Sequence, residues 1–429
     1  MLFVGFFLAT RAHGENPTVP DVQRYHDYGH AVAAGFVPYR DFRLEYPPAA
    51  LGVFVLPAFG TSGATWTPRL NAAARRYSNA FAALMILLGA VAIVLTALSL
   101  RVLRASTRDV LLALGVLSAA PLLLGGVVYT RYDFWPAALT AAAIAAALVG
   151  RMRLGSIALG VAAAAKLYPL ALLPLFVARA WKRRDRREAL TCLGLTLGAA
   201  ATIFVPFLAL APGPTASAVR EQIGRGLQVE SLGSAILATL HLVAHIHLYV
   251  RQAGNGLSAD ELHGSGTTAA LVSGSVVLAV FLATLWIRFA RSSADDRLFA
   301  QYCAAAVVGL LAFGHVLSPQ LLIWLLPVVP LVGGRRGVAA LVLLTVSLLA
   351  THVWFSRYYV AFVERLSTGS TLLLLTRDAL LVILVATLVW PASGAQKATA
   401  GEAKAWTTAV VQPVGWLGQP DADVGGEDL

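Results

Sequence analysis

The stretch "LGSIALGVAAAAKLYPLALLPLFVAR", residues 154–179, carries a single charge, that of Lys166, before it ends at Arg179. It has the length of a membrane helix, which needs about 17–25 mostly apolar residues. Two further arginines, Arg151 and Arg153, stand directly before it. Basic clusters mark the cytoplasmic ends of membrane helices, so one straight span would leave one of the two clusters on the wrong side.

The middle of this stretch resolves the conflict. Pro169 removes a backbone donor and disfavours helical backbone at Tyr168, so we expect two short helices that meet at "KLYP" and turn back. Each would rise about 17–20 Å at about 1.5 Å per residue, less than the hydrocarbon thickness of about 30 Å. The turn is therefore expected to be buried in protein or to line a wet cavity.

Composition extends this interpretation to the whole chain. Of the 429 residues, 58% are apolar and 13% are charged, and the mean hydropathy is +0.72. These values predict an all-α polytopic membrane protein, since lipid cannot satisfy an open sheet edge, and they argue against a soluble enzyme. The net charge of +11 lies in short clusters between apolar runs, which is typical of membrane topology, so no nucleic-acid partner is expected.

Further apolar runs are candidate membrane helices. They cover about residues 77–100, 109–128, 134–150, 188–211, 268–290, 298–315, 319–334, 337–354 and 370–390. With the two short helices and a truncated first span in "MLFVGFFLA", we predict a transmembrane domain over residues 1–390 that crosses the lipid bilayer about twelve times.

The basic clusters between these runs set the orientation. They are Arg101, Arg104 and Arg108; Arg151 and Arg153; the run from Arg179 to Arg187; Arg288, Arg291 and Arg297; and Arg335 and Arg336. Placing them all in the cytoplasm makes residues 11–76 and 211–267 external loops of a protein of the cytoplasmic membrane. Residues 391–429 lack apolar periodicity and are predicted to be a disordered cytoplasmic tail.

The external loop 211–267 contains one more apolar run, "SLGSAILATLHLVAHIHLYV". If this run crossed the membrane, the cluster at Arg288 to Arg297 would lie outside, so we expect an external helix with Ser234, His241 and His245 on its polar side. His241 and His245 have the four-residue spacing of metal ligands, but no acidic or cysteine ligand accompanies them. No metal site and no cofactor are predicted.

Charge is concentrated in a second short stretch, "YRDFRLEYPP", residues 39–48. We interpret it as part of a binding site on the outer face, because its mixture of ionisable groups and tyrosines exceeds what solubility demands. The alternative is a simply solvated loop before the proline pair. The candidate binding residues here are Arg40, Asp41, Arg43, Glu45 and Tyr46.

Five strings in order resemble the glycosyltransferase family 87 membrane proteins. They are "DVQRYHDYGHAVAAGFVPYRDFRLEYPP" at 21–48, "RYDFWPAAL" at 131–139, "LGVAAAAKLYPLALLPL" at 159–175, "RGLQVESL" at 225–232 and "SPQLLIWLLP" at 318–327. The resemblance implies a GT-C-like bundle with external catalytic loops. It also implies transfer of a hexose, mannose in this family, from a polyprenyl-phosphate donor to a glycolipid or glycan acceptor, with inversion.

In that superfamily an acidic residue just after the first span accepts the proton of the acceptor hydroxyl, and Asp21 matches this position. The departing phosphate needs positive groups, which Arg and Lys supply in different geometries. The candidates are Arg40, Arg43, Arg131, Lys166, Arg225 and His315. Asp133, Glu230 and Gln320, in the other matching strings, complete the predicted substrate-binding set.

Three points stay open from the sequence. Lys166, at membrane depth, needs a partner, and an internal ion pair with Asp133 competes with phosphate binding. His315 stands near the position where the family often has Lys before "SPQ", so a neutral imidazole that binds sugar is an alternative. Arg377 and Asp378, adjacent in the last span, are interpreted as structural.

The competing function is a transporter or flippase of a lipid-linked saccharide. Transporters usually bind their substrate at the bilayer midplane between repeated halves. This chain shows no such repeat, and its acidic residues lie at the outer mouth. A transferase is therefore the favoured prediction.

Overall fold

The computed structural model describes residues 1–13, 20–59, 72–252 and 260–390. Within these ranges seven helices are long and apolar enough to cross a membrane. They are α4 (Ala72–Val102), α5 (Thr107–Leu124), α10 (Arg186–Leu210), α13 (Thr267–Arg291), α14 (Asp296–Phe313), α15 (Gly334–Val353) with its continuation to Arg365, and α17 (Thr368–Val389). The predicted polytopic helical fold is confirmed, whereas the count of about twelve crossings stays a prediction.

Shorter elements fill the space between the long helices. The α-helices are α1 (Leu2–His13), α2 (Pro20–Ala33), α3 (Leu51–Val55), α6 (Val127–Thr130), α7 (Phe134–Leu148), α8 (Met152–Ala165), α9 (Leu173–Arg183), α11 (Pro212–Ile223), α12 (Leu232–Ala244) and α16 (Tyr359–Arg365). The 3₁₀ helices are η1 (Pro48–Ala50), η2 (Leu56–Ala58), η3 (Tyr168–Leu172), η4 (Pro319–Leu325) and η5 (Val329–Val332). A π-helical turn, Trp354–Tyr358, joins α15 to α16.

The predicted reversal at "KLYP" is confirmed. Helix α8 ends at Ala165, and Lys166 has an extended backbone (φ −163°, ψ 138°) before η3 begins. Arg179 near the end of α9 donates to the carbonyl of Ala147 at the end of α7 (3.3 Å) and ion-pairs with Asp296 at the start of α14. The two ends of the 154–179 stretch therefore lie on the same side of the bundle.

The predicted span at 319–334 is wrong as a continuous helix. The structure has two short 3₁₀ helices there, η4 and η5. Three prolines, Pro319, Pro327 and Pro330, stand within this run. Each removes a backbone donor, and none of the 3₁₀ turns extends into a regular α-helix.

The segment 211–267, predicted to be external, contains more than the predicted helix. α12 packs against α17 and α13, but its Ser234 is fully buried and hydrogen-bonds to the carbonyl of Gln228 (2.7 Å). A small antiparallel hairpin follows, with β1 (Leu248–Gln252) paired to β2 (Asp260–Gly264). The all-α prediction missed this hairpin, whose strands are only five residues long.

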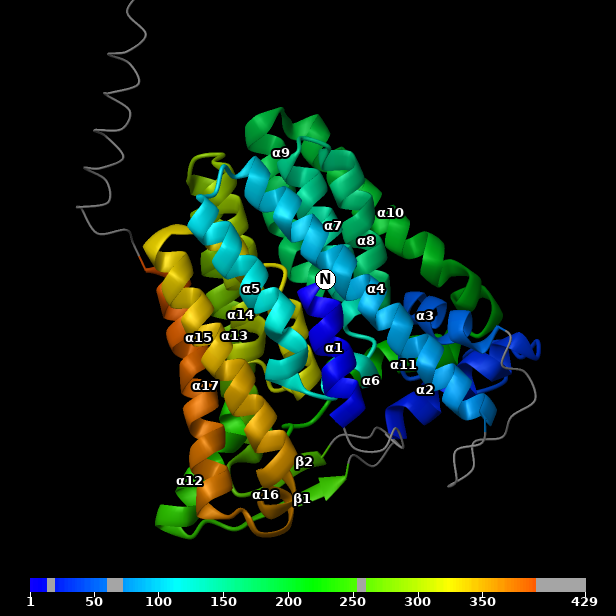
Figure 1. Ribbon diagram of the computed structural model, residues 1–429, viewed down its shortest axis with the longest axis vertical. Helices are drawn as coiled ribbons and strands as arrows, with labels where there is room; N and C mark the ends of the chain where they lie inside the picture. Colours follow the sequence, from blue (N-terminus) through cyan, green and yellow to red (C-terminus); the bar gives the residue numbers. More distant parts are fainter. Residues whose placement is uncertain (14–19, 60–71, 253–259, 391–429) are drawn as a thin grey trace, which may run out of the picture. The chain divides into compact units, whose positions relative to one another are not determined.

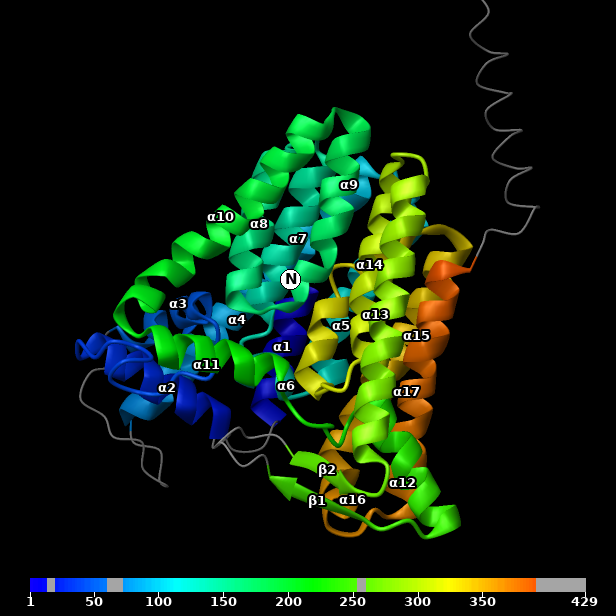
Figure 2. The same ribbon diagram turned by 180° about the vertical axis from the view of Figure 1, so that it is seen from behind.

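Figure 1 shows that the predicted cytoplasmic clusters gather at one end of the bundle. The turns from α4 to α5, from α9 to α10 and from α13 to α14 lie at the top of that view, while α12, α16 and the hairpin lie at the bottom. Figure 2 shows from behind that α10 leads down into α11 beside α2 and α3. This arrangement agrees with the orientation that the basic clusters predict.

Cysteine labelling tests this orientation. In intact cells Thr368→Cys should react with a membrane-impermeant maleimide, and Ser293→Cys should react only after lysis. Both positions are exposed, at opposite ends of the bundle, and the native Cys192 and Cys303 are buried, so background is low. The opposite pattern would invert the assigned topology.

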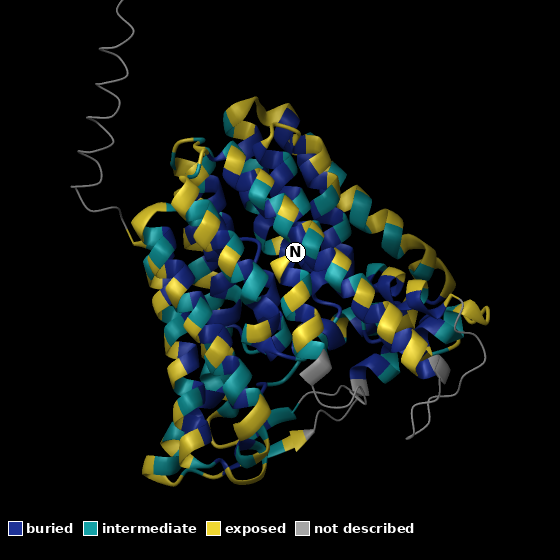
Figure 3. Cartoon of the chain, in the orientation of Figure 1, coloured by how far each residue is buried: buried dark blue, intermediate teal, exposed yellow. Residues whose placement is uncertain are grey.

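Buried residues concentrate where the helices meet, and yellow exposed positions follow the outer sides of the long helices in Figure 3. Only 6% of the apolar window of α10 and 11% of that of α13 are buried. Such helices are apolar on most sides, as expected for faces that contact lipid. The predicted disordered tail, 391–429, lies outside the described residues.

Candidate functional site

Asp21 lies in the first turn of α2, where a carboxylate is favoured by the helix N-terminus. Its side chain is buried and ion-pairs with Arg131, which follows α6. A second guanidinium, that of Arg24, lies 3.8 Å from the carboxylate one helical turn later. Asp21 is thus held between two cations.

Arg24 extends this cluster to the opening charged stretch. Its guanidinium donates to the carboxylate of Glu45 at 3.1 Å. Burial raises the pKa of Glu45, an effect that Arg24 opposes. The sequence prediction omitted Arg24 from the binding set, although its three-residue spacing from Asp21 on a helix is the signal of such a pair.

Lys166 and Asp133 form the second part of the site. The Lys166 ammonium donates to the buried Asp133 carboxylate at 2.7 Å, and Trp324 Nε1 donates to the same oxygen at 2.8 Å. The ammonium also lies 4.8 Å and 5.0 Å from the ring centroids of Tyr132 and Trp324. The ion pair that the sequence left as an alternative is therefore present.

Arg131 and Asp133 stand two residues apart before α7, so the Asp21 and Lys166 pairs are neighbours. Arg225 comes from the loop that follows α11. Its guanidinium donates to Gln222 (2.8 Å), and the Gln222 amide donates to the backbone carbonyl of Glu45. Residues from three of the family-like sequence segments, 21–48, 131–139 and 225–232, therefore lie together with the turn at Lys166.

Glu230 and His315 lie beside this group. Burial raises the pKa of Glu230 to about 8, although Arg377 and Arg131 oppose the shift. His315 is half-buried, and its backbone carbonyl accepts from the N–H of Gln228 at 3.0 Å. These contacts place the 225–231 segment against the loop that precedes η4.

The remaining predicted residues have other surroundings. Arg40 is exposed and pairs with Asp41 (2.8 Å). The hydrogen bond from Arg40, together with one from the N–H of Val37, lowers the pKa of Asp41 to about 2. Arg43 pairs with Glu221 of α11 at 2.8 Å.

Tyr46 packs among aromatic rings. Its ring centroid lies 5.2 Å from that of Tyr132 and 5.7 Å from that of Tyr25. Gln320 accepts from the hydroxyl of Ser318 at 2.8 Å. Tyr46 also interacts with Arg24, the second cation beside Asp21.

The histidine pair does not share a helix face. His245 has left-handed backbone (φ 54°) as the residue that ends α12, and His241 Nδ1 contacts the carbonyl of Ile246 at 2.6 Å. Among the described residues there is no group of three His, Cys, Asp or Glu side chains that could hold a metal ion.

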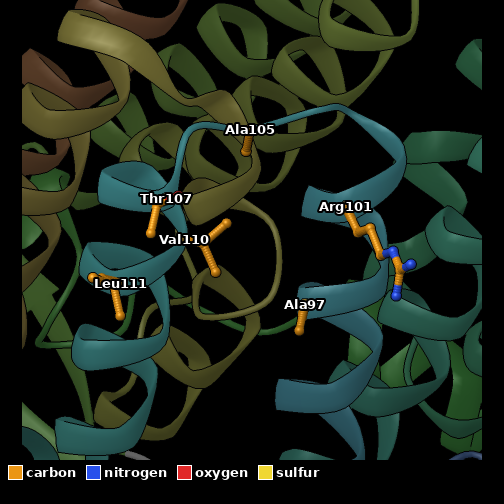
Figure 4. Close-up of a pocket in the computed structure, with 6 residues that line it drawn as sticks. All are labelled: Ala97, Arg101, Ala105, Thr107, Val110 and Leu111. Carbon is orange, nitrogen blue, oxygen red and sulfur yellow. The ribbon is translucent and has the colours of Figure 1, made fainter.

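A separate pocket of about 410 Å³ lies at the basic end of the bundle, between the end of α4 and the start of α5 (Figure 4). Its lining is Ala97, Arg101, Ala105, Thr107, Val110 and Leu111. None of the predicted site residues is among them. We therefore prefer as the functional site the ion pairs of Asp21 with Arg131 and of Lys166 with Asp133, which contain the candidate proton acceptor and phosphate-binding groups.

The raised pKa of Glu230 makes a testable prediction. The folded protein binds a proton more tightly than the unfolded chain, so stability should fall as pH rises from about 4.5 to about 8. The loss is at most about 1.4 kcal/mol per pH unit. Glu230→Gln should remove this part of the pH dependence in thermal unfolding of the detergent-solubilised protein. Glu364→Gln, at an exposed position, is the control, and a Glu230→Gln protein whose stability follows the wild-type pH profile would contradict the prediction.

The long apolar helices and the buried ion pairs define a multi-pass membrane protein with a polar site. The chain belongs to glycosyltransferase family 87, whose family model matches residues 44–319. The family assignment from the five strings is confirmed, and with it a glycosyltransferase activity. No curated protein matches the chain.

The matched region includes most of the site but not all of it. Glu45, Arg131, Asp133, Lys166 and Arg225 lie inside the match. Asp21 precedes the match, so its assignment rests on its position after the first apolar helix and on its contact with Arg131.

Proposed function

We propose that the chain transfers a hexose, namely mannose, from polyprenyl phosphate to a hydroxyl of a glycolipid or glycan acceptor. The reaction takes place on the outer face of the cytoplasmic membrane and inverts the anomeric carbon. Family membership supports the glycosyltransferase class. The observation that carries the site is the buried contact of Asp21 with Arg131, next to the pair of Lys166 and Asp133.

Asp21 acts as the proton acceptor in this proposal. The acceptor oxygen attacks the anomeric carbon, the bond from that carbon to the phosphate oxygen breaks, and its electron pair leaves with the phosphate. The hydroxyl proton passes to the Asp21 carboxylate. Two guanidinium groups beside Asp21 favour its ionised form. A weakly basic carboxylate suffices, because the hydroxyl becomes acidic as its bond to carbon forms.

Arg225 and Lys166 are the proposed partners of the departing phosphate. The Nε of Arg225 is buried and has no hydrogen-bond partner among the described residues. A buried donor of this kind is costly unless an acceptor meets it, and a phosphate oxygen is a strong acceptor. Lys166 adds a point charge that Asp133 holds in place. Burial of the charges strengthens both interactions.

Reconstitution tests the proposal. The purified protein in liposomes should convert polyprenyl-phosphate mannose and a mannoside acceptor into a lengthened mannoside. Polyprenyl-phosphate glucose is the matched donor control and should give little product. Movement of the lipid-linked sugar between leaflets without transfer would overturn the proposal in favour of a flippase.

A further inference from the structure

The last described helix, α17, contains a buried charged pair that the proposed reaction does not use. Arg377 and Asp378 are 2% and 1% exposed. They pair with each other, with Nε of Arg377 2.8 Å from the Asp378 carboxylate. Both lie beyond the end of the family match at residue 319. A buried charge is expensive, so its contacts indicate what it serves.

The side chain of Arg377 contacts a segment of the proposed site. Its guanidinium donates to the backbone carbonyl of Glu230 at 2.6 Å. Glu230 belongs to residues 225–231, which we call the outer segment. This segment carries Arg225, the residue proposed to bind the donor phosphate. One side chain of α17 thus contacts the backbone five residues from a proposed binding group.

Other contacts of the outer segment come from the hairpin and from the loop before η4. Val229 N–H donates to the carbonyl of Asp260 (3.1 Å), and Leu262 N–H donates to that of Leu227 (2.8 Å). Gly226 N–H donates to the Glu261 carboxylate at 2.8 Å. β2 itself is tied to the C-terminal helices.

That tie is made by Tyr359, whose hydroxyl donates to the Asp260 carboxylate. Tyr359 follows directly on the π-helical turn Trp354–Tyr358. Single π-helical turns inside α-helices occur frequently at functional sites. Residues 334–389 therefore hold the outer segment at two points, directly through Arg377 and indirectly through β2.

We propose that Arg377 is a positioning residue of the transfer site. It fixes the outer segment so that Arg225 meets the donor phosphate, while Asp378 balances its charge inside the helix. This inference rests on the proposed function. Groups that bind a reacting ligand must be held within about 0.5 Å, and a misplacement of about 1 Å costs on the order of 100-fold.

The decisive variant is Arg377→Met/Asp378→Leu, which removes both charges together. Replacing a buried ion pair by apolar residues of similar size is often neutral for stability, whereas removing one partner is not. The variant should therefore fold, yet lack the bond to Glu230. We expect the KM for polyprenyl-phosphate mannose to rise about tenfold or more, since a bond between charged groups is being misaligned. The kcat should change much less.

This split separates positioning from a purely structural role. A loss of fold lowers the fraction of active protein, and thus the apparent kcat, without changing KM. Arg153→Met/Glu188→Leu is the control, since this pair of α8 and α10 also lies 2.8 Å apart but has an exposed guanidinium and no contact with the outer segment among its described bonds. It should leave KM unchanged.

Amide hydrogen exchange gives a readout that does not need activity. In Arg377→Met/Asp378→Leu the amides of the outer segment should exchange at least about tenfold faster, and those of α7 should not. Unchanged exchange in the outer segment, or equal changes in the control variant, would overturn the inference. A wild-type protein without transferase activity would overturn the proposed function instead, and the exchange data would still decide whether Arg377 holds the segment.

Discussion

Asp21→Asn is expected to lower turnover about 100- to 10,000-fold, the usual contribution of a general base, while the protein stays folded. Asparagine keeps the size of the side chain and can still accept a hydrogen bond from Arg131, but it cannot take the acceptor proton. Asp133 also lies close enough to act on the charge of Arg131, so this guanidinium is not left without a counter-charge. The measurement is kcat in liposomes together with thermal unfolding.

Asp27→Asn is the matched control. Asp27 lies on the same helix, its side chain is 56% exposed and it contacts His26, so its substitution should leave kcat near wild type. Glu45→Gln should raise KM more than it lowers kcat, because Glu45 is proposed to bind substrate. Near-normal turnover in Asp21→Asn, with Glu45→Gln inactive, would show that the base is Glu45.

Asp133→Asn is expected to destabilise the protein by about 3–5 kcal/mol, the usual cost of leaving one member of a buried ion pair alone. Asp133 is 1% exposed and is the carboxylate that pairs with Lys166 in the described part of the chain. Arg225 and Arg131 lie near enough to repel an uncompensated ammonium. Thermal unfolding in detergent should show the loss.

The double variant Asp133→Asn/Lys166→Met should recover most of that stability, since it leaves no unpaired charge. It should not recover activity if Lys166 binds the donor phosphate. The exposed pair of Arg365 and Glu364 provides a control, because Glu364→Gln should change stability by less than about 1 kcal/mol. An Asp133→Asn protein as stable as wild type would contradict the assigned pair.

The reversal at Lys166 was predictable because charge and proline signals are local. Basic residues at both ends excluded a straight span, and Pro169 indicated where the chain turns. The break of 319–334 into 3₁₀ helices had a similar signal in its three prolines, but hydropathy alone does not register backbone donors. Hydropathy thus predicted where the apolar segments lie better than it predicted whether each segment forms one continuous helix.

The sequence indicated which residues belong to the candidate site, but it indicated far less well which of these residues contact each other. Asp21 and Arg131 are separated by 110 positions, and Arg377 and Glu230 by 147. Which charges meet over such distances depends on how helices pack, and no periodicity in the sequence encodes that. The hairpin was missed because strands of five residues beside histidines and charges resemble loop sequence.

The contacts of α9 have a consequence for the order of events during synthesis. Arg183 bonds to the carbonyl of Ala294 (3.0 Å), and Arg179 pairs with Asp296, which lies 117 residues further along the chain. At about 5–20 residues per second a ribosome needs roughly 5–25 s to make that interval. During this time the second half of the reversed pair has to remain beside α8 without its final partners. Nascent chains that stop before residue 294 should therefore leave α9 accessible to protease, and chains that extend past α14 should protect it.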